Sequence, residues 1–326
     1  MLTRILTVEW CWGNRQVART AQVGGVPRPV DGRFRALATR TRRLGEIGRE
    51  SLRNPTTLLG GVIVSLLLLM ALFAPLLIEA NTPNAYQMPR DFSAINVPPG
   101  TDGHVLGTTP TGGDVLYGIV WGARTSLRLS IIVVAITVVV GVAVGSVAGF
   151  LGGKWDEILM RVVDVFLSVP ELIFALAIAA VLGPAFGNII LALAVVFWVK
   201  YARIIRGQII HVKQNEYVDA ARVMGDKRWR IFFKDVLPNS ITPVVVQATV
   251  DMGHVVLIGA TLSFIGLAEA GLAEWGNLVS EGQSGIIAGR WWVATFAGAM
   301  VFLWSLAFNL LGDGLRDVLD PKSEQR

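Results

Sequence analysis

Six long apolar stretches dominate the pattern of hydrophobic and polar positions along this 326-residue chain. The first, 58–78, contains 21 residues without a charge. A helix of about 20 residues spans the roughly 30 Å hydrocarbon core of a bilayer. The other stretches are 130–151, 165–182, 186–205, 241–267 and 291–311. This pattern predicts an all-α, polytopic membrane protein with six transmembrane helices.

Composition supports a membrane protein and excludes several other classes. Hydrophobic residues make up 53% of the chain and charged residues only 16%, whereas soluble proteins have about 25% charged residues. The single cysteine excludes an internal disulfide framework, and the three histidines lie far apart in the sequence. We therefore expect no metal site in this chain.

The distribution of lysine and arginine predicts the orientation of the spans, because these residues accumulate in cytoplasmic loops. Nine of them fall between positions 200 and 234, whereas 79–123 and 267–290 each contain one. The first 57 residues contain eleven arginines and four acidic residues, a net charge of +7. We predict that both termini are cytoplasmic. The N-terminal arginines either contact anionic lipid headgroups or act only as a topology signal.

Three common nucleotide-binding and hydrolase motifs, G-x-x-x-x-G-K-[ST], H-E-x-x-H and G-x-S-x-G, are not found in the sequence. A phosphate-binding loop needs the pattern G-x-x-x-x-G-K-[ST]. The only Gly-Lys pair is Gly153-Lys154, which has Ala148 at the upstream glycine position and Trp155 after the lysine. We expect no catalytic residue and no cofactor bound by this chain.

The loop 215–239 has the most unusual polar pattern. Glu216 and Asp219 favour a helix N-terminus through the helix dipole, and Gly225 stands where a helix would end. The residues after Gly225 alternate aromatic and aliphatic side chains with lysine and arginine, as in a helix that lies at a membrane interface. From the residues alone, the loop is either an interfacial anchor or a docking element for a partner.

Asp219-Ala220-Ala221, then Gly225 and Leu237-Pro238, resembles the EAA loop of ATP-binding-cassette importer permeases. In that family the loop forms a coupling helix that docks onto a separate ATPase subunit. The resemblance implies coupling roles for eight residues: Glu216, Tyr217, Asp219, Ala220, Ala221, Gly225, Leu237 and Pro238. Asp219 stands where the family pattern has Glu, so the carboxylate is kept.

Other motifs narrow the resemblance to the C-type permeases of the dipeptide, oligopeptide and nickel importers. They are 104–108, 122–127, 262–267 and, most specific, 308–317 with 319–321. The resemblance implies a type I importer fold, with a basic tail over 1–50, a first helix and extracytoplasmic loop over 51–123, a transmembrane core over 124–316 and a short tail over 317–326.

The same resemblance implies a location and a set of partners. The location is the inner, cytoplasmic membrane. The partners are a second homologous permease, two ATPase subunits that bind ATP and Mg²⁺, an extracytoplasmic substrate-binding protein and membrane lipid, with no nucleic acid.

Several polar residues fall inside predicted spans, where an unpaired charge is costly. Gln247, Asp251 and His254 follow i, i+4, i+7 and share one helix face. That face either lines a translocation pathway, or Asp251 and His254 satisfy each other or a residue of the partner permease. Pro170 should kink the third span, and Glu171 is either a gate residue or a carboxylate hydrated at the interface.

The expected function is that of a permease subunit that imports peptides or similar small solutes, using ATP hydrolysed by its partners. The alternative is a secondary transporter or channel in which Asp251 and His254 relay protons or ions. Lys200 and Arg203, in the last turns of the fourth span, are expected to snorkel to the headgroup layer.

Overall fold

The structure is a computed structural model that describes residues 55–79 and 84–319. The described residues are helical apart from their connections, and they contain isolated β-bridges but no named strand. The predicted N-terminal tail lies outside the described residues, as does most of the predicted C-terminal tail. The all-α prediction is confirmed.

Five helices are long and apolar enough to cross a membrane, and a bent pair would make a sixth span. The five are α2 (Pro55–Leu77), α3 (Val115–Leu151), α6 (Phe186–Val212), α10 (Thr242–Phe264) and α12 (Trp292–Leu319). α3 begins 15 residues before the predicted start of the second span, because Asp114 caps it by accepting a hydrogen bond from the backbone N–H of Tyr117.

The third predicted span differs from the structure. Residues 152–164 were expected to form a loop, but α4 (Gly153–Leu167) is helical, and α5 (Glu171–Leu182) follows at an angle of 84°. Pro170 ends the first helix rather than kinking a continuous one, because its ring excludes helical geometry at the preceding residue. Gly152 and Gly153, both with positive φ, separate α4 from α3.

Close helix packing depends on small residues. α3 and α6 form the most extensive helix pair of the bundle. A Cβ at Gly141 would lie 2.5 Å from the carbonyl oxygen of Trp198 and 2.5 Å from the Cβ of Tyr201, so only glycine fits there. α12 packs against α10, α2 and α11. The buried side chains of these helices form the hydrophobic core.

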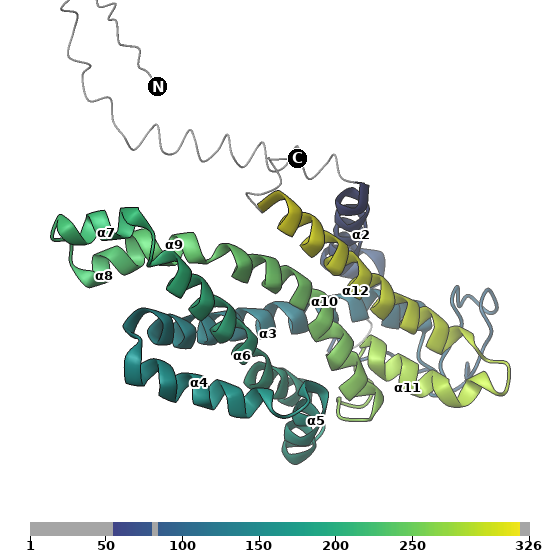
Figure 1. Ribbon diagram of the computed structural model, residues 1–326. Helices are drawn as coiled ribbons and strands as arrows, with labels where there is room; N and C mark the ends of the chain where they lie inside the picture. The colour runs from purple at the N-terminus through teal and green to yellow at the C-terminus, as the bar shows by residue number, and fades with distance from the viewer. Residues whose placement is uncertain (1–54, 80–83, 320–326) are drawn as a thin grey trace, which may run out of the picture. The chain divides into compact units, whose positions relative to one another are not determined.

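The connections gather at two ends of the bundle (Figure 1). One end carries α7 (Glu216–Val223), α8 (Arg228–Ile231), a π-turn η1 (Phe232–Val236) and α9 (Leu237–Ser240). We call it the basic end, because most loop lysines and arginines lie there.

The other end carries α11 (Trp275–Ile286), which the sequence analysis did not predict, and the loop 84–114. The backbone N–H of Ala273 donates to the carbonyl oxygen of Tyr86 at 2.7 Å and joins these two segments. His104 and Asp114 lie 2.6 Å apart and hold the loop against the start of α3.

Candidate functional site

Helix α7 is a short amphipathic element whose inner face fixes it to the bundle. Val218 and Ala221 are buried in a cluster built from α6, α8, η1 and the start of α10. The outer face carries exposed apolar groups: Tyr217 is 45% exposed, Val223 88% and Met224 78%. A rigidly seated helix with an exposed apolar tip has the form of a docking element.

Gly225 ends α7 as predicted. Its φ is +82°, a conformation that favours glycine. The backbone N–H of Gly225 donates to the carbonyl oxygen of Arg222 at 3.0 Å, and that of Asp226 donates to the carbonyl oxygen of Ala221 at 3.2 Å. This pair of bonds is a Schellman motif, and it ends α7 before the chain continues into α8.

The remaining predicted coupling residues lie on both faces of this region. Asp219 accepts from Arg222 at 2.6 Å on the exposed surface, and Glu216 and Ala220 are also exposed. Leu237 is half-buried against the cluster below α7, whereas Pro238 is exposed. The segment after Gly225 is helical, as expected, with one π-turn.

A second group of functional candidates joins three helices inside the bundle. Glu171, the first residue of α5, lies 2.6 Å from the ammonium of Lys200 on α6. Its other oxygen is 3.8 Å from Nε2 of His254 on α10. The ring of Phe197 lies beside both partners of Glu171, with centroid distances of 4.5 Å to the Lys200 Nζ and 5.5 Å to the His254 ring. We call Glu171, Lys200 and His254 the polar triad.

The triad bears on two expectations about single residues. Lys200 pairs with Glu171, because the antiparallel hairpin of α5 and α6 brings them together, and its reach to the headgroup layer stays a prediction. Glu171 is not freely hydrated, since its side chain is only 24% exposed. Arg203 pairs with Asp164 of α4.

Asp251 lies apart from the triad. It is 1% exposed and accepts from the Gln247 side-chain amide at 2.9 Å, while Tyr201 of α6 lies beside it. The predicted face is therefore split, with Asp251 turned into the bundle and His254 turned toward α5. The structure gives no contact between Asp251 and His254. The role of Gln247, Asp251 and His254 in translocation stays a prediction.

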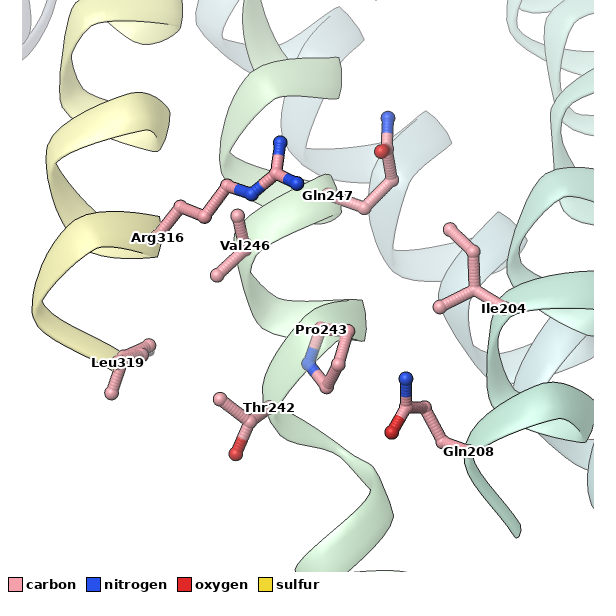
Figure 2. A pocket seen from close by; sticks show the side chains of 8 residues that line it. All are labelled: Ile204, Gln208, Thr242, Pro243, Val246, Gln247, Arg316 and Leu319. Carbon is pink, nitrogen blue, oxygen red and sulfur yellow. The ribbon is translucent and has the colours of Figure 1, made fainter. Parts of the chain in front are cut away.

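A cavity of about 510 Å³ opens beside Gln247 near the basic end (Figure 2). α6 contributes Ile204 and Gln208, and α10 contributes Gln247. Figure 2 shows Arg316 reaching from α12 toward α10. The sequence analysis missed Arg316 and Gln208, because helix periodicity does not indicate which distant helices meet.

Within the described residues, no group of three His, Cys, Asp or Glu side chains is arranged to hold a metal ion. The ionisable groups inside the bundle are instead arranged in hydrogen-bonded or charge-paired sets that combine separate helices. Such an arrangement can contact a polar solute or reorganise when the helices move.

Two family models match this sequence. Residues 141–325 match the model of the binding-protein-dependent transport system inner membrane component, and residues 44–99 match the N-terminal transmembrane domain of oligopeptide transport permease C. The chain belongs to the binding-protein-dependent permease family. It is a multi-pass membrane protein and a permease subunit of an ABC importer.

Curated permeases resemble this family member over most of their length. The probable D,D-dipeptide transport system permease protein DdpC of Escherichia coli is 41% identical, with 83% of this chain and 89% of the relative covered. The dipeptide permease DppC of Bacillus subtilis is 37% identical, covering 84% of each chain. The glutathione permease GsiD of Pectobacterium atrosepticum is 36% identical, covering 85% and 90%.

A solved structure shares the fold of this permease. The MetNI methionine ABC transporter, determined in inward-facing conformations, aligns with a TM-score of 0.53 and 19% identity, covering 63% of this chain and 98% of the solved one. This confirms the type I importer fold. Family membership favours an ATP-driven permease over the alternative of a secondary transporter.

Proposed function

We propose that this permease imports short peptides or related small solutes across the inner membrane of a bacterium. The names of its relatives support a peptide-like cargo, since they include dipeptide and glutathione permeases. These cargoes share a compact size, an amide backbone and charged termini.

The observation that carries the coupling part of this proposal is the exposed tip of α7. Val223 and Met224 are among the most exposed apolar side chains at the basic end, and exposed apolar groups on an ordered element mark an interaction site. The partner is an ATPase subunit that binds ATP and Mg²⁺, and this chain holds neither. Two such subunits serve the complete importer, one for each of two homologous permeases.

The proposed orientation places the basic end in the cytoplasm and α11 with the loop 84–114 outside. The uneven distribution of lysine and arginine supports this orientation. An extracytoplasmic binding protein delivers the solute to the outer end, and closure of the ATPases at α7 shifts the bundle between two states. We expect the polar triad and Gln247 to contact the moving solute.

Co-purification tests the docking role of α7. In the Val223→Asp variant, a charge replaces an apolar group at the centre of the proposed contact. We expect at least a tenfold loss of bound ATPase subunit, as for a hot-spot residue. Ile287→Asp is the matched control, because Ile287 is also a highly exposed aliphatic residue (98%, against 88% for Val223) and lies at the opposite end.

Retention of the ATPase by Val223→Asp, at the level of the control, would contradict the docking role. The cargo is tested separately. The binding protein recovered with the wild-type complex is titrated with di- and tripeptides, and failure of all of them to bind would contradict a peptide-like cargo while leaving the docking result intact.

A further inference from the structure

An apolar groove runs along the side of α3 at the basic end. Its volume is about 490 Å³. α3 forms one wall, and the aromatic side chains after α7 form the other, including Trp229 and Phe233, whose rings stack at 6.2 Å. Phe150 and Phe232, with centroids 4.8 Å apart, join the two walls.

The dimensions of the groove fit a hydrocarbon chain. Its lining on α3 runs from Val138 to Leu151, which is about 20 Å of helix. One leaflet of a bilayer contributes about half of the 30 Å hydrocarbon core. Ser146 is the single hydroxyl-bearing residue in this lining. The groove therefore suits an acyl chain better than a peptide, which would leave its backbone groups unpaired.

The segment 227–234, which supplies the aromatic wall of the groove, is strongly basic. Lys227, Arg228 and Lys234 alternate with its aromatic lining residues and are exposed. The structure gives these three no ion pair within the part of the chain it describes. Arg230, which lies on α8 with Arg228, is different because its guanidinium lies 3.4 Å from Asp226, so its charge is partly neutralised. Three unpaired cations beside an apolar groove are the charge complement of a phosphate group attached to a hydrocarbon chain.

We propose that this groove binds one anionic phospholipid, with an acyl chain along α3 and the phosphate held by Lys227, Arg228 and Lys234. The groove opens onto the same face of α3 as the exposed apolar residues Ile132, Ile136 and Val139, so a lipid can enter it sideways from the bilayer. The bound lipid stiffens the segment that connects α7 to α10. The site depends only on membrane insertion, not on the identity of the cargo.

Native mass spectrometry of the full chain tests this site. The chain is placed in nanodiscs that contain equal amounts of phosphatidylglycerol and phosphatidylcholine with the same acyl chains, then released in mild detergent. We expect one retained phosphatidylglycerol. Replacing the three basic residues with glutamine should reduce its enrichment about fivefold for each charge removed.

Two further variants separate the lipid site from general effects. Ala143→Phe fills the groove without changing any charge, so it should reduce retention of both lipids. Arg161→Gln removes one exposed arginine of α4 that has no ion pair in the described chain and lies outside the groove. It should retain lipid as the wild type does.

Three outcomes would overturn the proposal. They are equal retention of the two lipids by the wild type, absence of any retained lipid, and equal losses in Arg161→Gln and the triple variant. Each variant counts as folded if its elution volume and thermal midpoint match those of the wild type. If the triple variant unfolds, Ala143→Phe still tests the proposal.

Discussion

Glu171 illustrates how a single carboxylate is accommodated inside the bundle. Its two oxygens face different partners, the ammonium of Lys200 at 2.6 Å and Nε2 of His254 at 3.8 Å. Removing one partner of a buried ion pair leaves an uncompensated charge, which costs more than removing both. Since the pair keeps partial solvent contact, with side chains 24% and 27% exposed, the cost is smaller than for a fully buried pair.

Lys200→Met is therefore expected to destabilise the permease by about 1–3 kcal/mol. The double variant Glu171→Gln/Lys200→Met should recover much of that loss, because it contains no isolated charge. Thermal unfolding in detergent measures both effects. A double variant that is less stable than Lys200→Met would contradict this prediction. It would show that the isolated Glu171 charge is not the cause of the lost stability.

Glu274 gives a pH prediction outside the transmembrane helices. It caps α11 by accepting from the backbone N–H of Asn277 at 3.1 Å, and it is only 2% exposed. Burial raises the pKa of Glu274 above its usual value of 4.5. The folded state thus holds its proton at a pH where the unfolded state has released it.

The contribution of Glu274 to stability is complete below pH 4.5 and is lost as the pH rises through the raised pKa. The loss has a maximum slope of about 1.4 kcal/mol per pH unit. Glu274→Gln stays neutral, so we expect its thermal midpoint to fall less than that of the wild type between pH 4.5 and neutrality. Parallel curves for the two proteins would contradict this account.

At the level of elements, the Schellman turn after α7 determines where the exposed tip points. Gly225→Val forces a β-branched residue into a left-handed conformation, which costs about 1–2 kcal/mol. A Cβ there would meet no atom within 4 Å, so the effect is conformational rather than steric. We expect faster amide hydrogen exchange in α7 and weaker coupling of ATP hydrolysis to uptake.

Gly207→Val is the control for this substitution. Gly207 also has open space around its Cα, but it lies within α6, where its φ is not positive. Exchange in α7 should match the wild type. Equal acceleration by both variants would indicate general loosening rather than loss of the turn.

The elements show where sequence analysis succeeds and where it fails. Apolar runs located all five of the long helices, because burial in lipid demands continuous hydrophobicity. They missed α4 and α11, whose apolar residues cover only one face and are mixed with polar ones. Pro170 signalled a disturbance but not an 84° bend, since the bend depends on how α5 packs against α6.

Among the functional residues, too, local features were predictable from the sequence and tertiary contacts were not. The end of α7 at Gly225 was predictable, because glycine at a helix end has a local cause. The pairing of Glu171 with Lys200 was not, because it depends on a tertiary contact between α5 and α6. The i, i+4, i+7 spacing placed Gln247, Asp251 and His254 on one helix face. It indicated neither the hydrogen bond between Gln247 and Asp251 nor the separation of Asp251 from His254.

The whole molecule is a permease bundle, and we propose that a partner ATPase supplies the energy for transport. Its docking helix is at one end, its polar triad lies inside, and the loop 84–114 and α11 close the other end. Membership of the permease family supports separate roles for transport in this chain and for ATP hydrolysis in a partner. Among the described elements, α7 is the one we expect to contact that partner.

The central claim is tested most directly by uptake into proteoliposomes that contain the permease pair, its ATPase subunits and its binding protein, with ATP supplied on the ATPase side. We predict uphill accumulation by the complete assembly. With Val223→Asp, uptake should fall at least tenfold, and it should be absent for the chain alone. Uphill uptake by the chain alone, or undiminished uptake by Val223→Asp, would contradict the account.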